Sequence, residues 1–347
     1  MIFARLSFRP AIRQLALLLA ITLGAATTPA FAVGYKGAIV IDAATGQALF
    51  EDNPDFVSPP ASVTKLMTFL VVHDALVAGR LTLTTPVTAN AVDQSMGGTQ
   101  VHLAAGETFT VEELLYAVMV ESANDAAQAL SHAAAPDRES FVTLMNARAK
   151  SLGMTNTTFR SPHGLPPASR NLADGDLTTP RDLALLSREL VAHTDVLRYA
   201  ATRTRSFGAG VRATPQPMLN HNKLLGKVDG VDGLKTGFTR GAGFCLAATA
   251  RRGDRRLIVV TMGGDTSKER DLRIAQLIEK TFPLIPATSA FQEFTGSPIN
   301  ASNQSGSPLI ETPVVPKAST PAQNPSAKPA PAANEPPTVR FTLPPRK

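Results

Sequence analysis

The chain has 347 residues, of which 44% are hydrophobic and 18% charged, so it can build a substantial core. This composition excludes a wholly disordered or collagen-like protein. The formal net charge is +6, but residues 1–32 carry +3 of it and residues 288–347 carry +2. The region between them is nearly neutral, and we expect no basic groove for nucleic acid.

The first 32 residues have the pattern of an export signal. Three arginines precede an apolar run at residues 15–26, and Ala30-Phe31-Ala32 has the small residues that a signal peptidase accepts. We therefore predict a signal peptide over residues 1–32, cleaved after Ala32. The alternative is a retained membrane anchor, but Thr27, Thr28 and Pro29 interrupt the run before it reaches about 20 apolar residues.

Residues 33–287 are predicted to form one catalytic domain with mixed helices and strands. The apolar runs around Ala44-Thr45-Gly46 predict a β-hairpin over residues 37–50, and further strands are predicted over 231–239, 243–250 and 256–264. Helical periodicity predicts helices over residues 62–76, 111–132, 138–152, 180–192 and 268–282. Strands at both ends with helices between them indicate a sheet that the chain leaves and rejoins.

Residues 288–347 contain 12 of the 27 prolines and few large apolar side chains. Such a segment cannot bury enough surface to offset its ordering entropy, which predicts a disordered tail. A role as a spacer or tether is the functional alternative.

Three short segments carry the candidate chemistry. In the first, Ser62 and Lys65 lie three positions apart at the head of a predicted helix, so the amine can reach the hydroxyl. A serine needs a base to become a good nucleophile, and a lysine can serve if burial or a neighbouring cation lowers its pKa. This pair suits acyl transfer, although the spacing alone also fits a helix cap beside a solvated lysine.

The second segment contains Ser122 and Asn124, and the third is the run Lys235-Thr236-Gly237-Phe238-Thr239. A hydroxyl, an amide and a second ammonium can relay a proton to a leaving amine and hold a substrate. Gly237 is expected to let a substrate strand approach the sheet edge closely. Read separately, these residues could be polar positions in a helix and a strand that ends in a turn.

Together, these segments resemble the low-molecular-mass penicillin-binding proteins, the D-alanyl-D-alanine carboxypeptidases that trim peptidoglycan, whose S-x-x-K and K-T-G motifs are shared with class A β-lactamases. The resemblance covers residues 37–282 and includes PPASVTKLMT, ESAND, SPHGL, TTPRDLALL, DGLKTGFT, AGFCLAATA and MGGDTSKERD. It implies an α/β (α+β) fold of the β-lactamase/transpeptidase type, with an antiparallel sheet flanked by helices, a mostly helical subdomain and an active site between them.

The resemblance also implies a role for each residue. Ser62 would attack the carbonyl between the terminal D-alanines of a peptidoglycan stem peptide, with Lys65 as general base. Ser122 would pass a proton to the leaving amine, and Asn124 would orient Lys65 and the substrate amide. The N–H groups of Ser62 and Phe238 would form the oxyanion hole. The substrate-binding residues would be Lys235, Thr236, Gly237, Phe238, Thr239 and Arg270, the last pairing with the terminal carboxylate.

The same resemblance implies that β-lactam antibiotics acylate Ser62 and leave slowly, and that the enzyme works outside the cytoplasmic membrane, in the periplasm or cell envelope. The proline-rich tail stands where relatives often carry a second domain and an amphipathic anchor, so membrane attachment stays open. Phe238 also replaces the histidine that some relatives have after Lys-Thr-Gly.

Three alternatives remain. A DD-endopeptidase that cleaves cross-links shares the three motifs. A class A β-lactamase needs a glutamate after the second motif, and residues 159–165 contain no acid. A catalytically silent wall-binding protein has no reason to keep Ser62, Lys65 and Lys235. No histidine pair has metal-ligand spacing and no glycine-rich phosphate loop is present, so we expect neither a metal nor a cofactor. Cys245, the single cysteine, is expected to be a buried small hydrophobe.

Overall fold

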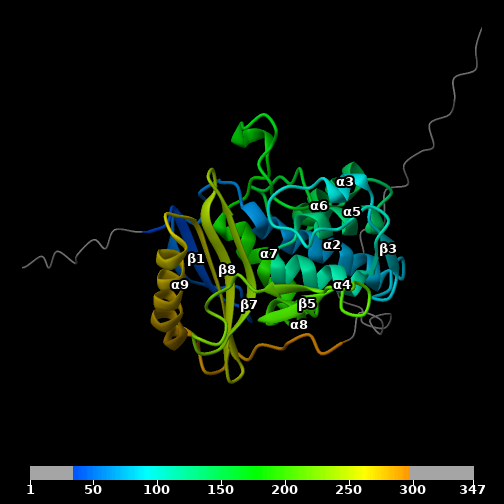
Figure 1. Ribbon diagram of the computed structural model, residues 1–347. Helices are drawn as coiled ribbons and strands as arrows, with labels where there is room; N and C mark the ends of the chain where they lie inside the picture. The colour runs from blue at the N-terminus through cyan, green and yellow to red at the C-terminus, as the bar shows by residue number, and fades with distance from the viewer. Residues whose placement is uncertain (1–33, 297–347) are drawn as a thin grey trace, which may run out of the picture. The chain divides into compact units, whose positions relative to one another are not determined.

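A computed structural model describes residues 34–296 of the chain (Figure 1). The strands are β1 (Gly37–Asp42), β2 (Ala48–Asp52), β3 (Pro86–Thr88), β4 (Thr108–Thr110), β5 (Thr204–Phe207), β6 (Gln216–Leu219), β7 (Val231–Thr239), β8 (Gly243–Arg252) and β9 (Arg255–Gly264). The α-helices are α2 (Lys65–Val77), α3 (Ala91–Gln94), α4 (Val111–Tyr116), α5 (Asn124–Ala134), α6 (Arg138–Ser151), α7 (Pro180–His193), α8 (Val196–Ala200) and α9 (Ser267–Thr281). The short turns are η1 (Ala61–Thr64), η2 (Ala117–Glu121), η3 (Leu172–Asp174) and η4 (Phe282–Leu284).

The predicted strands form one antiparallel sheet. Its order is β2-β1-β9-β8-β7, so the first hairpin pairs with the last strands of the domain. This confirms the predicted hairpin and the three later strands, and it shows that the chain leaves the sheet after β2 and rejoins it at β7. β7, which carries residues 235–239, lies at an edge of the sheet.

Both faces of the sheet are covered, as the apolar runs of its central strands require. Along β9, Ile258 and Val260 belong to the core shared with α2, α5 and α7, whereas Leu257 and Val259 pack with α9 on the other face. Figure 1 shows α9 against one face and α2 and α7 on the opposite side. Cys245 is fully buried on the α2 side, as the sequence predicts.

The predicted helix over residues 111–132 is interrupted in the structure, which corrects the sequence prediction. α4 continues into the π-helical turn η2, Ser122 then adopts a left-handed conformation with φ of 69°, and Ala123 is extended before α5 begins. The helical periodicity continues through this break, so the pattern of apolar residues did not reveal it. Because of this break, Ser122 lies between η2 and α5 and belongs to neither, and its side chain contacts Lys235 of β7.

The predicted helix that begins at Ser62 has a 3-10 first turn. η1 contains Ser62, and α2 begins at Lys65. The helices predicted over 138–152, 180–192 and 268–282 are confirmed within one or two residues as α6, α7 and α9. Each of these starts at an N-cap side chain, from Asp137, Thr179 and Thr266 respectively, that accepts a backbone N–H.

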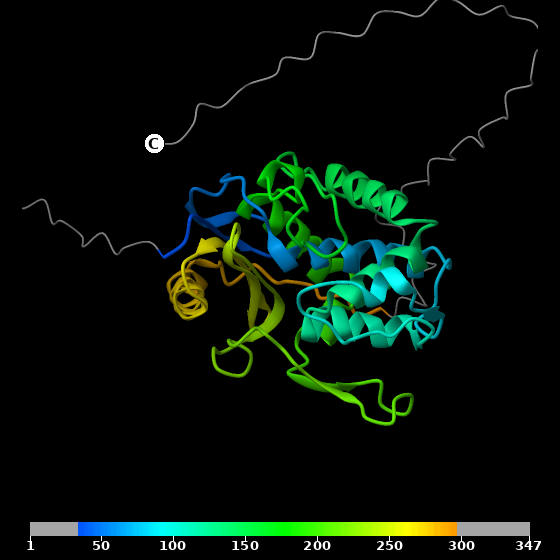
Figure 2. The same ribbon diagram turned by 45° about the horizontal axis from the view of Figure 1, so that its top comes forward.

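Two small antiparallel pairs were not predicted, β3 with β4 and β5 with β6. Strands of three or four residues are too short to show a clear alternation. Figure 2 shows the β5–β6 hairpin, in yellow-green, projecting from the rest of the domain.

Residues 288–296, which the sequence prediction assigns to the tail, contact the domain. The Phe291 N–H donates to the Asp254 carbonyl over 2.7 Å, and the Phe291 side chain is buried. Glu293 forms an ion pair with the buried Arg256. The ordered domain therefore continues past the predicted boundary at residue 287. The predicted signal peptide and the rest of the predicted tail lie outside the described residues.

Candidate active site

Ser62 and Lys65 lie side by side where η1 passes into α2. The Lys65 Nζ donates to Ser62 Oγ over 3.0 Å, to Asn124 Oδ1 over 2.6 Å and to the His163 carbonyl over 2.8 Å. An ammonium ion can donate to all three acceptors, whereas a neutral amine can donate to Asn124 and His163 and direct its lone pair at the Ser62 hydroxyl. The spacing of three residues therefore places the amine on the hydroxyl, as the sequence predicts.

Burial favours the neutral amine form of Lys65, which is the form that can act as a base. Its side chain is fully buried, and this desolvation lowers its pKa well below the usual value. The positive charge of Lys235 lowers the pKa further, while Asp176 and Asp125 act weakly in the opposite direction. A lysine with a depressed pKa can hold a neutral amine near neutral pH and accept a proton from Ser62.

Ser122 and Lys235 form a second hydroxyl–ammonium pair. The Lys235 Nζ donates to Ser122 Oγ over 2.9 Å and to the Thr236 carbonyl over 2.9 Å. Burial, followed by the charge of Arg270, lowers the pKa of Lys235 to about 7. The left-handed backbone at Ser122 is sparsely populated for a residue with a Cβ, and such backbone strain is common at functional sites.

Asn124 connects Lys65 to the loop before β4. Its Oδ1 accepts from Lys65, its Nδ2 donates to the Gly97 carbonyl over 2.8 Å, and its backbone N–H donates to the Thr99 carbonyl. Because both ends of the amide are engaged, its orientation is determined and its oxygen faces Lys65.

Gly237 allows a close approach, but the approaching segment is η1. A Cβ at this position would lie 2.5 Å from the Pro60 carbonyl oxygen and 3.1 Å from the Ser62 nitrogen. Gly237 thus lets β7 pack directly against the turn that holds Ser62, and its expected role in admitting a substrate strand stays a prediction. This contact brings the backbone of β7 beside the Ser62 N–H.

Phe238 and Thr239 are the last two residues of β7. Phe238 is 52% exposed and stacks on Phe244 with ring centroids 4.1 Å apart. Thr239 Oγ1 accepts from the Ala242 N–H and so closes the turn into β8. Thr236 is buried beside Lys235.

Arg270 lies on α9 and is buried, close enough to Lys235 to lower its pKa. Its Nε and Nη2 donate to Asp271 Oδ1 over 2.9 and 2.7 Å, and its Nη1 donates to the Cys245 carbonyl over 3.4 Å. In this arrangement, one edge of the guanidinium is already paired with a carboxylate. Its predicted role in binding the substrate carboxylate stays a prediction.

Two residues of the site were missed or misjudged from the sequence. His163 was not identified as a site residue, yet its carbonyl accepts from Lys65. Asp176 was not identified, and its buried carboxylate accepts from Thr64 Oγ1, from Ser161 Oγ and from the N–H groups of Arg160 and Ser161. Asp176 thus fastens the loop that carries His163 to η1. The SPHGL segment was the available signal for His163, but a backbone carbonyl leaves no trace in side-chain identity.

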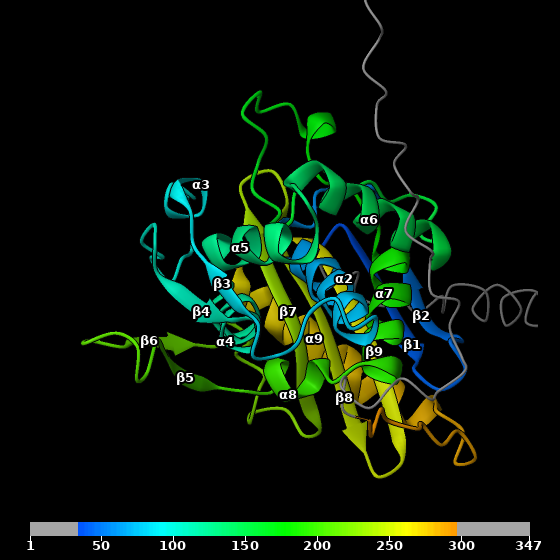
Figure 3. The same ribbon diagram turned by 90° about the vertical axis from the view of Figure 1, so that its right-hand side faces the viewer.

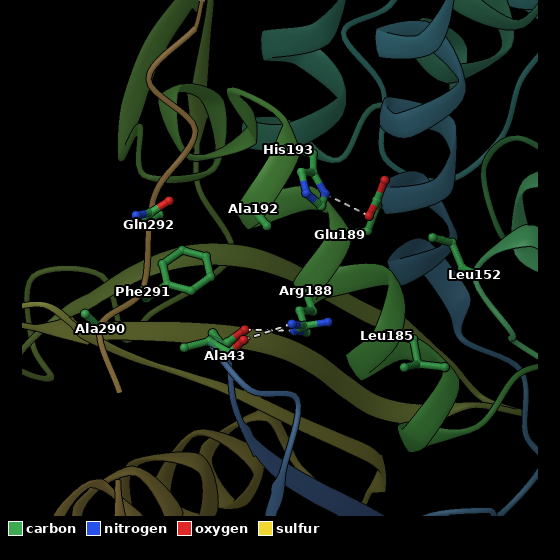
Figure 4. A pocket seen from close by; sticks show the side chains of 11 residues that line it. Ala43, Leu152, Leu185, Arg188, Glu189, Ala192, His193, Ala290, Phe291 and Gln292 are labelled. Atoms are coloured by element: carbon green, nitrogen blue, oxygen red, sulfur yellow. Dashed lines mark hydrogen bonds and ion pairs between the residues drawn. The ribbon is translucent and has the colours of Figure 1, made fainter. Parts of the chain in front are cut away.

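A separate pocket of about 370 Å³ lies away from this site. Side chains of α7 and residues 290–292 line it, and Arg188 donates to the Ala43 and Ala44 carbonyls there (Figure 4). None of the ten predicted site residues lines this pocket. Within residues 34–296, no cluster of His, Cys, Asp or Glu could hold a metal ion, and no helix is long and apolar enough to cross a membrane.

Comparison with known proteins agrees with the geometry. D-alanyl-D-alanine carboxypeptidase DacC of Escherichia coli is 40% identical over 251 residues, which are 70% of this chain and 60% of DacC. The D-alanyl-D-alanine endopeptidase of E. coli is 29% identical over 266 residues, which are 74% of this chain and 82% of the endopeptidase. Ampicillin-bound penicillin-binding protein D2 of Listeria monocytogenes superposes with a TM-score of 0.65 at 33% identity, covering 73% of this chain and all of that one.

The chain spans about 60% of the length of the curated carboxypeptidases it matches. The profile of the D-alanyl-D-alanine carboxypeptidase family matches residues 24–266, which is more than half of the chain. The chain therefore belongs to the D-alanyl-D-alanine carboxypeptidase family of serine peptidases.

Proposed function

We propose that this protein is a serine-type D-Ala-D-Ala carboxypeptidase that removes the terminal D-alanine from peptidoglycan stem peptides. The observation that carries the proposal is the hydrogen-bonded set of Ser62, Lys65 and Asn124 facing the Ser122–Lys235 pair. A nucleophile next to a buried amine and a second hydroxyl next to a cation are the groups that acyl transfer needs.

In the proposed reaction, Ser62 Oγ attacks the carbonyl carbon between the two D-alanines and Lys65 Nζ takes its proton. The backbone N–H groups of Ser62 and Phe238 stabilise the oxyanion, since Gly237 brings β7 against η1. The departing amine takes a proton through Ser122, and the C–N bond breaks. Water then attacks the acyl-enzyme, and the peptide leaves with a new carboxylate while Ser62 recovers its proton.

β-Lactams are proposed to acylate Ser62 in the same way. The ampicillin-bound and cefotaxime-bound structures of penicillin-binding protein D2 support this proposal. Rapid β-lactam hydrolysis is not proposed. Residues 159–165 contain no acid, and the Asp176 carboxylate that follows them is engaged by Thr64, Arg160 and Ser161.

An exported location is part of the proposal, because the enzyme's substrate is cell-wall peptide and residues 1–32 have the pattern of a signal peptide. DD-endopeptidase activity is the second candidate. The observation that favours it is the 82% of the E. coli endopeptidase that this chain covers, against 60% of DacC.

A paired assay on the mature protein tests the proposal. We expect a fluorescent penicillin to label the wild type and not Ser62→Ala, and a pentapeptide substrate to release free D-alanine only with the wild type. Labelling of both proteins would exclude Ser62 as the nucleophile. Cleavage of cross-linked muropeptide dimers without release of D-alanine from pentapeptide would instead establish the endopeptidase.

A further inference from the structure

The pocket beside α7 takes no part in the proposed reaction. Its volume is about 370 Å³, which is within the range of cavities that hold small ligands. The turn after β1, the helix α7, Leu152 at the end of α6 and residues 290–292 enclose it. Figure 3 shows α7 between α6 and the strands β1 and β2. Elements of the folded domain therefore form the walls of this pocket.

Arg188 presents a positive charge to the pocket without a counter-ion. Its Nε donates to the Ala43 carbonyl over 2.8 Å, and its Nη2 donates to the Ala44 carbonyl over 2.9 Å. Both partners are neutral, and no carboxylate in the described part of the chain forms an ion pair with this guanidinium. By contrast, Arg181 on the same helix and Arg148 on α6 each pair with two carboxylates. Arg188 is half-buried, so its charge favours an anion beside it.

The two backbone carbonyls also determine which edge of the Arg188 guanidinium is left. A guanidinium has five N–H groups, and the carbonyls take one from Nε and one from Nη2. In Figure 4 the third nitrogen points away from the Ala43 carbonyl. Nη1 and the second N–H of Nη2 thus remain side by side. This edge matches the two oxygens of a carboxylate.

Glu189 lines the same pocket but does not supply the missing anion. Its carboxylate accepts from Arg148 Nη2 over 2.6 Å and lies 2.8 Å from His193 Nδ1. The hydrogen bond to Glu189 raises the pKa of His193, which favours a second cation at the rim of the pocket. Asp74, the other partner of Arg148, does not line the pocket. The charge of Glu189 is therefore already matched, and that of Arg188 is not.

The other side chains that line the pocket are mostly apolar. They are Leu152 and Leu185 from the two helices, Ala192, and Phe291 from the segment that follows α9. An apolar group placed among them would leave water, which favours its binding. A ligand with an anionic end and an apolar body therefore matches both parts of the pocket.

We propose that this pocket binds a small organic carboxylate, with its two oxygens on Arg188 and its apolar body against Leu185, Ala192 and Phe291. The proposal goes beyond the peptidase reaction, because the ligand does not occupy the candidate active site. A bound ligand would contact α7, the turn after β1 and residues 290–292 together. Since it binds only the folded domain, it should raise the Tm.

Phenylacetate is the probe, and phenylacetamide is its uncharged counterpart with the same apolar body. Each is titrated into the mature protein by calorimetry. We expect phenylacetate to bind with a Kd of about 1 mM or lower, as suits a ligand of this size. Phenylacetamide should bind at least about tenfold more weakly, because it cannot form a charge-assisted pair with Arg188.

Four variants locate the site. Arg188→Gln removes the charge and should weaken phenylacetate binding at least about tenfold. Ala192→Leu fills the apolar part while leaving Arg188 in place, and it should weaken binding similarly. Arg181→Gln is the matched control, because Arg181 lies on α7 outside the pocket, and it should bind like the wild type. Arg270→Gln should also leave the Kd unchanged, since Arg270 belongs to the candidate active site.

Several results would overturn the proposal: no phenylacetate binding at about 10 mM, equal Kd values for phenylacetate and phenylacetamide, or the wild-type Kd in Arg188→Gln. Weaker binding in Arg270→Gln but not in Arg188→Gln would place the probe in the candidate active site and would also overturn it. A Tm equal to that of the ligand-free wild type shows that a variant is folded. If Arg188→Gln does not fold, Ala192→Leu and the comparison with phenylacetamide decide the outcome.

Discussion

At the scale of single residues, two buried lysines each hold one hydroxyl of the candidate site, and burial lowers the pKa of both. Burial and the nearby Lys235 charge lower the pKa of Lys65, which favours a neutral amine that can accept the Ser62 proton. Lys235 has a pKa of about 7 and is most useful as a cation that donates to Ser122. Like charges in one site push the two titrations apart, so one amine can act as base while the other stays charged.

The pH profile of the reaction should report this division. As pH rises, loss of the Lys65 proton increases kcat/KM, and loss of the Lys235 proton near pH 7 then decreases it. Lys235→Arg keeps a cation at every accessible pH, because arginine does not deprotonate in proteins. We expect the falling limb to move upward by at least one pH unit in this variant, whatever its maximum rate, as measured by D-alanine release.

An unchanged falling limb in Lys235→Arg would assign that titration to another group. Arg270 contributes to the low pKa of Lys235, so Arg270→Gln supplies the second measurement. Removing that positive charge should raise the Lys235 pKa and shift the falling limb to higher pH.

At the scale of elements, the site depends on β7 packing against η1 without a side chain between them. The contact requires a glycine at position 237, because a Cβ there would meet the Pro60 carbonyl 2.5 Å away. The same packing places the β7 backbone beside the Ser62 nitrogen, where the proposed oxyanion hole forms. One short contact therefore serves both the fold and the proposed catalysis.

Gly237→Ala should separate these two elements. Overpacking costs about 1–3 kcal/mol, and a displaced β7 also loses oxyanion stabilisation. We expect a lower Tm and penicillin acylation slowed by about 100-fold, followed with a fluorescent penicillin. Gly34→Ala is the control, because its added Cβ would meet only ordinary contacts at 3.5 Å. Acylation at the wild-type rate in Gly237→Ala would show that the contact does not position the oxyanion hole.

At the scale of the whole domain, residues 288–296 contact both β1 and β9 of the sheet. Ser289 donates to Asp42 at the end of β1, Phe291 packs into the main core, and Glu293 pairs with Arg256. Arg256 is fully buried on β9 and also pairs with Asp232 on β7 over 2.8 Å. The segment thus supplies one of the two carboxylates that neutralise a buried guanidinium.

Removing either contact should destabilise the domain. Phe291→Ala deletes a buried aromatic ring at a cost of about 3 kcal/mol. Glu293→Gln leaves Arg256 with one carboxylate partner and should also lower the free energy of unfolding, measured by urea titration. Gln292→Ala, an exposed neighbour, should unfold at the wild-type urea midpoint. Midpoints equal to wild type in both variants would show that the segment does not stabilise the fold.

Much of this architecture was predictable from local patterns. The hairpin over residues 37–50, the three later strands and the helices α6, α7 and α9 follow from apolar periodicity and polar helix starts. The break at Ser122 did not, because no proline or glycine marks it in residues 117–124 and the apolar periodicity continues through it. The contacts of residues 288–296 with the domain were not predicted, because their partners are distant in the sequence. Phe291 packs into the main core, Glu293 pairs with Arg256, and Phe294 contacts the ring of His73.

The reactive groups and one local geometry, the reach of Lys65 to Ser62, follow from the order of the amino acids alone, because residues three apart on one helical turn are neighbours. The groups that surround this pair depend on the folded chain. Along the chain, Asn124 and His163 lie 59 and 98 residues from Lys65, and Lys235 lies 113 residues from Ser122. These groups come into contact only in the folded domain. Burial then lowers the lysine pKa values, and burial is a property of the whole fold.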